Sequence, residues 1–135
     1  VGLITGTVGC FGGMSIATGL CSYLVVTKEA RLGLNGPQVI EQEAGITEYD
    51  SKDKPFIWSM TGGEIRYETG FADELAVDDV DAVRTAIAKC FAQGSPESFR
   101  TDRVGFYLPR LAGFDASQQV FPEITKALFS QGDRK

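Results

Sequence analysis

Apolar runs alternate with glycine-rich turns at the start of the chain, in an order typical of α/β proteins. The apolar run 1–5 predicts a short buried strand, and residues 6–9 predict the loop that leaves it. A helix over about 13–22 is predicted by apolar residues at helical spacing, namely Met14, Ile16, Ala17, Leu20 and Cys21. Residues 23–27 are again β-branched and apolar, so the order strand, glycine turn, helix, strand predicts parallel strands.

The middle of the chain carries shorter apolar segments separated by turn residues. Residues 30–34 predict a short strand, and residues 37–43 predict a helix that begins at a proline. Segments 56–60 and 64–69 predict two further short helices. Residues 71–77 then predict one more short strand.

The last part of the chain predicts two longer helices around an irregular region. Asp78 or Asp79 is a suitable N-cap for a helix over 80–93. Its apolar face is predicted to consist of Val80, Val83, Ile87, Cys90 and Phe91. We expect 96–117 to be mostly loop, and apolar spacing predicts a final helix over about 118–130.

Length and composition favour one domain. The chain has 135 residues, of which 43% are hydrophobic, enough for one core. Because it begins at Val1 inside a strand-like run, we expect 1–135 to be a single partial domain whose N-terminal half is absent. A net charge of -5 argues against a nucleic-acid partner. Glycines interrupt the apolar stretch 1–26 and no signal-peptide pattern is present, so we expect a cytoplasmic protein without a membrane partner.

The side chains present exclude several kinds of site. The chain contains no histidine, so it cannot build a Ser-His-Asp triad and lacks the usual imidazole base. The three cysteines, Cys10, Cys21 and Cys90, have no metal-ligand spacing, and we interpret them as buried, reduced thiols. We therefore expect no metal site.

The turn before the first predicted helix can carry chemistry. Gly12 and Gly13 stand where a strand and loop lead into that helix, so unpaired backbone N–H groups are expected there at the positive end of the helix dipole. Such amides can stabilise a negatively charged oxygen. Two glycines before a buried helix are, taken alone, more often a packing device.

Three segments around this turn resemble the crotonase superfamily signature. They are GCFGGMSIA at 9–17, CSYLVV at 21–26 and ARLG at 30–33. The resemblance implies a crotonase-like (ClpP/crotonase) ββα spiral of α/β class, here its C-terminal half. It also implies that the amide of Gly12, supported by Gly13, forms half of an oxyanion hole for an acyl thioester, with the other half supplied by an earlier turn.

Two departures from that superfamily limit the reactions that the chain is expected to catalyse. Crotonase hydratases carry glutamates where this chain has Ser15 and Gln38, so addition of water to an enoyl thioester is not expected. Oxyanion stabilisation without paired carboxylates suits an enolate, which forms when a malonyl thioester loses CO2. Decarboxylation and carboxyl transfer both fit.

A second motif, LGLNGPQVIEQ at 32–42, resembles the carboxyltransferase β subunit of acetyl-CoA carboxylase. Together with EQEAGI at 41–46, FIWSM at 56–60 and GGE at 62–64, it most resembles the β subunit of biotin-independent malonate decarboxylase. That family implies a second crotonase-fold (gamma) subunit and an acyl-carrier subunit as partners. Malonyl and acetyl thioesters would be carried on a phosphoribosyl-dephospho-CoA arm of the carrier, with no biotin and no cofactor held tightly by this chain.

These expectations define the candidate site. Gly12 and Gly13 are the predicted oxyanion donors, and the predicted substrate-binding residues are Phe11, Ser15, Gly36, Pro37 and Gln38. Packing is the alternative for Ser15, and a tight turn is the alternative for Gly36. Two other functions stay open: a carboxyltransferase subunit of a biotin-dependent acyl-CoA carboxylase, and a non-catalytic subunit that docks the carrier.

Basic residues near the end of the chain are candidates for contact with the anionic arm or the carrier. They are Arg100, Arg103, Arg110, Lys126, Arg134 and Lys135. Scattered surface charge is the more common arrangement, and it is our preferred interpretation.

Overall fold

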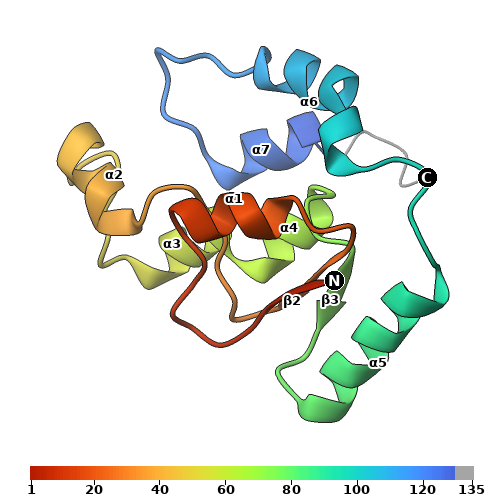
Figure 1. Ribbon diagram of the computed structural model, residues 1–135. Coiled ribbons are helices and arrows are strands. Elements are labelled where there is room, and N and C mark those ends of the chain that lie inside the picture. The colour runs from red at the N-terminus through yellow and green to blue at the C-terminus, as the bar shows by residue number, and fades with distance from the viewer. Residues whose placement is uncertain (130–135) are drawn as a thin grey trace.

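A three-stranded parallel sheet lies at the centre of the computed structural model, which describes residues 1–129 (Figure 1). Strands β1 (Gly2–Ile4), β2 (Leu24–Thr27) and β3 (Glu74–Ala76) are adjacent in that order. Gly2 pairs with Leu24. All residues of β2 are buried, because β2 is the central strand and helices cover both of its faces.

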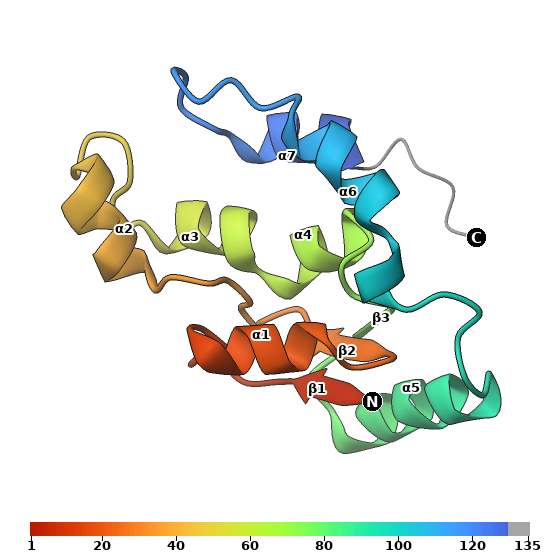
Figure 2. The ribbon, with the colours of Figure 1, turned by 45° about the horizontal axis from the view of Figure 1, so that its top comes forward.

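The helices are arranged in layers around this sheet. Their bounds are α1 Gly13–Gly19, α2 Pro37–Ala44, α3 Lys54–Thr61, α4 Gly63–Glu68, α5 Val80–Ala92, the 3₁₀ helix η1 Arg100–Asp102, α6 Val104–Leu111 and α7 Pro122–Phe129. Figure 2 shows α5 on one side of the sheet and α3 and α4 on the other, with α6 and α7 stacked beyond α4. None of these helices within the described chain has the length and apolar character needed to cross a bilayer.

Alternation along β2 divides the core into two clusters. Leu24 and Val26 face the side of α4, where they pack in one buried cluster. Val25 points to the opposite face and packs with Ala86 and Cys90 of α5. Each face of the sheet is therefore closed by a different helix.

Most elements predicted from apolar spacing are confirmed. The strands at 1–5, 23–27 and 71–77 and the helices at 13–22 and 37–43 are present with shifted ends. The apolar pattern of strand 23–27 reflects its burial, whereas the helices at 13–22 and 37–43 have no buried residue in the described structure.

The starts of two later helices are also defined. Asp79 caps α5, where its carboxylate accepts hydrogen bonds from the amides of Asp81 and Ala82. The last helix begins at Pro122 rather than near 118, and its predicted end at Ser130 lies outside the described residues.

The prediction that 96–117 is mostly loop is wrong, because this region contains η1 and α6. No side chain caps the start of α6 and Pro109 lies inside the helix, so both local signals for a helix are weak. The helix is held by tertiary packing instead. The ring of Tyr107 lies 5.3 Å from that of Phe71, a residue far away in the sequence.

Two smaller predictions also need correction. Residues 30–34 do not form a strand in the sheet; they make isolated bridges, with Leu32 beside Cys10 and Arg31 beside Gly62. The predicted face of α5 is too wide, since Val80 is 73% and Phe91 is 71% exposed.

The cysteines are free thiols. Cys90 is buried, which raises the pKa of its thiol, and Cys10 and Cys21 are half-buried. The prediction of full burial is therefore confirmed for Cys90 alone among the three.

Candidate functional site

The glycine turn stands at the start of α1. Gly12 is the N-cap of this helix and has φ 66° and ψ -144°, a conformation that side-chain-bearing residues rarely adopt. A Cβ atom at Gly12 or Gly13 would have no neighbour within 4 Å. Glycine is therefore required at position 12 by backbone conformation, whereas the space around the turn is open.

The amide of Gly12 is already engaged. It donates a hydrogen bond of 2.7 Å to the carbonyl of Leu34. This geometry does not match the expectation that Gly12 provides an open oxyanion donor, because its N–H points at another part of the chain. The bond instead joins the turn to the segment that leads into α2.

The amide of Gly13 has a different environment. Gly13 is the first residue of α1, where an amide has no partner within its own helix, and no hydrogen bond from it is found within residues 1–129. It is exposed and stands at the positive end of the helix dipole. Of the two predicted donors, Gly13 is the one with a free N–H in the described structure.

Ser15 turns back toward the turn. Its hydroxyl donates to the carbonyl of Gly12 at 2.6 Å, and its amide donates to the same oxygen at 3.0 Å. In this structure the Ser15 side chain therefore stabilises the turn, which favours the packing alternative for this residue.

Phe11 packs beneath the turn. A Cβ atom at Gly33 would lie 3.0 Å from the Phe11 ring, so the ring rests directly on the Gly33 backbone. The guanidinium of Arg31 lies 5.5 Å from the centroid of the same ring. Contact between Phe11 and a substrate stays a prediction.

Gly36, Pro37 and Gln38 form the start of α2. Gly36 is its N-cap in an extended conformation, with Pro37 in the first turn. Within the described chain, neither Gly36 nor Gln38 uses its amide in a hydrogen bond, and the Gln38 side chain is exposed. Figures 1 and 2 both show α2 beyond the N-terminal end of α1, so the two predicted segments lie on the same side of the molecule.

The surface beside the turn is apolar and open. No residue of α1 is buried, and Met14 and Ile16 are 68% and 59% exposed. The side of the turn formed by α1 is therefore exposed in the described chain.

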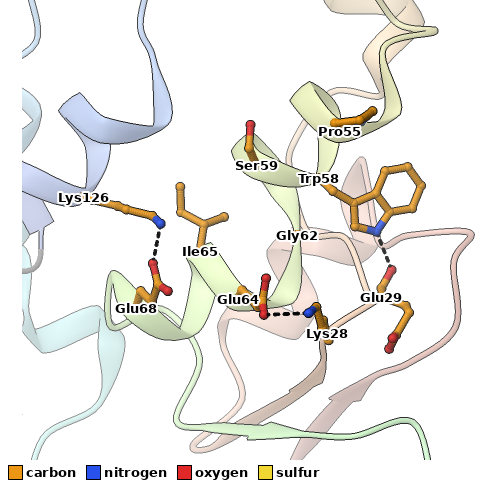
Figure 3. Close-up of a pocket in the computed structure, with 10 residues that line it drawn as sticks. All are labelled: Lys28, Glu29, Pro55, Trp58, Ser59, Gly62, Glu64, Ile65, Glu68 and Lys126. Carbon is orange, nitrogen blue, oxygen red and sulfur yellow. Dashed lines mark hydrogen bonds and ion pairs between the residues drawn. The ribbon is translucent and has the colours of Figure 1, made fainter.

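A separate pocket of about 340 Å³ lies beside α3 and α4 (Figure 3). It is lined by Lys28, Glu29, Pro55, Trp58, Ser59, Gly62, Glu64, Ile65, Glu68 and Lys126. Two ion pairs occupy four of its charged side chains: Lys28 lies 3.2 Å from Glu64, and Lys126 lies 2.8 Å from Glu68. It shares no residue with the glycine turn, and we do not assign it to the acyl chemistry.

The basic residues predicted as candidates for the anionic arm are mostly engaged within the chain. Arg100 lies 2.6 Å from Asp73 in an ion pair whose arginine side chain is 11% exposed. Arg103 donates to Ser98. Arg110 donates to the carbonyl of Phe106 and its guanidinium lies 3.7 Å from that ring centroid.

Lys126 is occupied by its ion pair with Glu68, whose hydrogen bond raises the pKa of the lysine. Arg134 and Lys135 lie outside the described residues. The side chains of Arg100, Arg103 and Arg110 thus make hydrogen bonds within the chain, as described above. The expectation of scattered surface charge is wrong for Arg100, because its side chain is largely buried.

Arg31 is a residue near the turn that the sequence pattern did not single out. Its guanidinium donates to the carbonyls of Thr7 and Val8, in the loop before the turn. Arg31 belongs to the motif ARLG at 30–33, but the resemblance of this motif to the crotonase signature depends on its apolar and glycine residues. A lone arginine in such a motif carries no local signal, because its partners lie more than 20 residues away along the chain.

The chain is similar to solved structures of malonate decarboxylase and of a transcarboxylase. The chain superposes on a chain of a Pseudomonas malonate decarboxylase hetero-tetramer in complex with malonate, with a TM-score of 0.88 and 58% identity over 94% of its length. A Pseudomonas malonate decarboxylase hetero-dimer matches with 57% identity over 82% of the chain and a TM-score of 0.69. The 12S transcarboxylase matches at 30% identity over 73% of the chain, covering 17% of that protein, with a TM-score of 0.51.

A curated protein is also similar to most of the chain. The malonyl-S-ACP:biotin-protein carboxyltransferase MADC of Malonomonas rubra is 34% identical over 105 residues, or 78% of this chain. No protein-family model matches. The chain spans 33% of the Malonomonas protein, 46% of the tetramer chain and 44% of the dimer chain. From this agreement in sequence and fold, the chain belongs to the family of malonate decarboxylases and related carboxyltransferases.

Proposed function

We propose that this chain is part of the β subunit of a malonate decarboxylase, a cytoplasmic enzyme that converts a malonyl thioester into an acetyl thioester and CO2. The observation that carries the proposal is the 58% identity to a malonate decarboxylase structure described as a complex with malonate. In this proposal the chain is the C-terminal half of a crotonase-like spiral.

The reaction requires an acceptor for negative charge. When the bond between the α-carbon and the carboxylate carbon breaks, its electron pair moves into an enolate and the charge settles on the thioester oxygen. A preorganised N–H donor stabilises that oxygen more in the transition state than in the substrate. We assign this role to the amide of Gly13, which has no other partner in residues 1–129.

Gly12 has a supporting role in this proposal. Its positive φ reverses the chain before α1, and its hydrogen bond to Leu34 ties the turn to the second motif. Gly36 to Gln38 then line the side of the site that receives the substrate carboxylate. The α-carbon takes its proton from water or from a group on the partner.

The partners follow from the same proposal. A second crotonase-fold (gamma) subunit would close the open face of α1, and an acyl-carrier subunit would present the thioester. The phosphoribosyl-dephospho-CoA arm of the carrier would extend to the turn. Arg100 does not fit as a ligand of its phosphates, because its guanidinium is largely buried and bonded to Asp73, Cys21 and Phe71 within the chain.

Replacing Gly13 by proline provides a direct test. Proline removes the N–H but is well accommodated as the first residue of a helix, so the fold is expected to persist. Gly13→Ala is the matched control, since it keeps the amide and its Cβ meets no atom within 4 Å. In the reconstituted complex, Gly13→Pro is expected to lower kcat for CO2 release by about 100-fold or more.

Three outcomes of this test are informative. Loss of activity in Gly13→Pro with retention in Gly13→Ala supports the amide as donor. Equal losses in both variants would indicate that space, and not the N–H, matters at this position. Normal turnover by an assembled Gly13→Pro complex would contradict the assignment and would favour a non-catalytic subunit that docks the carrier.

A carboxyltransferase is the second candidate function, favoured by the 34% identity to the Malonomonas carboxyltransferase. In that case the carboxyl group would pass to a biotin acceptor instead of leaving as CO2, and the enolate would take up the proton that biotin gives up. Assays with and without biotin separate the two candidates. CO2 release without biotin supports the decarboxylase, and strict dependence on a biotin acceptor supports carboxyl transfer.

A further inference from the structure

We propose that Arg31 is a positioning residue, which holds the loop 5–9 and thereby fixes the glycine turn that follows it. This inference rests on the proposed function, because it assigns Arg31 to the same oxyanion site. Arg31 contacts no reacting atom and acts through the backbone before Gly12.

The loop carbonyls converge on one guanidinium. Arg31 donates from Nε and Nη2 to the carbonyl of Thr7, at 3.1 and 2.8 Å, and from Nη2 to the carbonyl of Val8 at 2.7 Å. Thr7 and Val8 are both exposed, and Val8 is 86% exposed. The Arg31 guanidinium therefore holds two loop residues that lie on the surface. A planar fork of donors is suited to bridging neighbouring acceptors in this way.

Other anchors of the loop are few. Among residues 1–129, the further hydrogen bond made by residues 5–9 runs from the Thr5 hydroxyl to Asp78 at 2.8 Å. Gly6 and Gly9 have φ of 70° and 91°, so the loop contains two residues of high conformational freedom. Without the Arg31 side chain, residues 6–9 would keep no hydrogen bond to other residues within 1–129, and the loop would be held only at its two ends.

The guanidinium is itself fixed between two aromatic rings. It lies 4.5 Å from the ring centroid of Trp58 and 5.5 Å from that of Phe11. The indole N–H of Trp58 donates to the carbonyl of Glu29 at 2.9 Å, which holds that ring in place. Arg31 is therefore oriented by α3 on one side and by the residue next to Gly12 on the other.

The backbone of the same segment extends the support to the turn. The carbonyl of Arg31 accepts from the amide of Cys10 at 2.8 Å, and the amide of Gly33 donates to the carbonyl of Cys10 at 3.2 Å. The bond from Gly12 to Leu34 completes the set. Side chain and backbone of 31–34 thus contact the chain from Thr7 to Gly12.

Arg31→Met and Arg31→Lys in the reconstituted complex test the inference. Methionine keeps the length and apolar contact with the rings but removes every donor, and lysine restores charge without the planar fork. We expect Arg31→Met to lower kcat for CO2 release by about 10- to 100-fold with KM changed less than about twofold, since misplacement affects the transition state more than binding. Arg31→Lys is expected to recover part of this loss.

The control is Arg84→Met. Arg84 lies on α5 with a side chain that is 77% exposed, so its loss is expected to leave kcat unchanged. Hydrogen exchange is the second readout: the amides of Cys10 and Gly12 should exchange faster in Arg31→Met than in Arg84→Met. Equal kcat and equal exchange in the two variants would overturn the inference. A kcat loss explained entirely by reduced assembly would overturn it as well.

If the proposed function is wrong, the activity and hydrogen-exchange measurements give a different combination of results. If the wild-type complex releases no CO2 from a malonyl thioester, the decarboxylase assignment fails. The exchange rates of Cys10 and Gly12 still report whether Arg31 holds the turn, because that measurement needs no substrate.

Discussion

The amide of Gly12 donates a 2.7 Å hydrogen bond to the carbonyl of Leu34, which joins two motifs that are separated by a helix and a strand. The bond has two consequences. It places the turn before α1 next to the segment that begins α2, and it leaves Gly13 as the turn glycine whose N–H has no partner within residues 1–129. Candidate donors in such a turn are therefore distinguished by their hydrogen-bond partners and not by glycine content.

Alanine substitutions at the two turn glycines should have opposite effects on stability. Gly12 has φ 66°, so Gly12→Ala is expected to destabilise the full-length subunit by about 1–3 kcal/mol through backbone strain. Gly13→Ala lies in a helix with open space around the new Cβ and should be neutral or stabilising by up to about 1 kcal/mol. Urea denaturation of both variants measures the difference. Equal free energies of unfolding would show that the turn is not held in this conformation.

Gly33 is expected to tolerate no side chain while Phe11 is present. A Cβ atom there would lie 3.0 Å from the Phe11 ring, so Gly33→Ala should displace the ring and destabilise the subunit by about 1–3 kcal/mol. Phe11→Leu, which replaces the ring by a smaller side chain, should restore part of this loss in the double variant. Gly36→Ala is the stability control, since no atom lies within 4 Å of its Cβ. Additive effects in the Gly33→Ala, Phe11→Leu pair would contradict direct contact.

The Arg100–Asp73 pair is expected to anchor the C-terminal helices to the sheet. Arg100 also donates to the carbonyls of Cys21 and Phe71, and Asp73 also accepts the amide of Leu24. Arg100→Met removes the largely buried guanidinium and leaves the partly buried carboxylate of Asp73 with fewer partners, so a loss of about 3 kcal/mol in the free energy of unfolding is expected.

The comparison for this pair is Lys126→Met, which breaks the ion pair with Glu68. Both of those side chains are about half exposed, at 47% and 46%, so its loss should cost no more than about 1 kcal/mol. Urea denaturation measures both variants. Similar small losses would mean that Arg100 contributes only as surface charge does.

Tyr49 should make stability fall at alkaline pH. Its side chain is 8% exposed, and burial raises the pKa of the phenol above its ordinary 10.0, with Arg66 and Arg31 opposing this shift. The unfolded chain therefore loses this proton at lower pH than the folded chain. The contribution to stability is complete below pH about 10 and is lost as pH rises through the folded-state pKa.

Tyr49→Phe removes the titration and keeps the ring that packs 5.2 Å from Phe56. The thermal unfolding temperature of Tyr49→Phe is expected to fall less than that of the wild type between about pH 8 and about pH 11. Parallel curves for the two proteins would show that the phenol is not buried in the folded state.

Elements marked by a local apolar run or by a proline at a helix start were predictable from the sequence. Strand β2 and helix α2 follow from local apolar runs and a proline, whereas α6 does not, because its stability comes from contact between Tyr107 and Phe71. The isolated bridges of residues 30–34 also depend on tertiary structure, because Arg31 and Leu32 pair with residues outside the sheet.

The glycine turn, the absence of a histidine base and the order of the elements around β2 could all be predicted from the sequence. Which amide of the turn is free, and that Arg31 holds the loop before it, became visible only in the folded chain. Backbone conformation and apolar periodicity depend on neighbouring residues, so they leave a local pattern. A hydrogen bond such as that from Gly12 to Leu34 leaves none, because it depends on where distant segments meet.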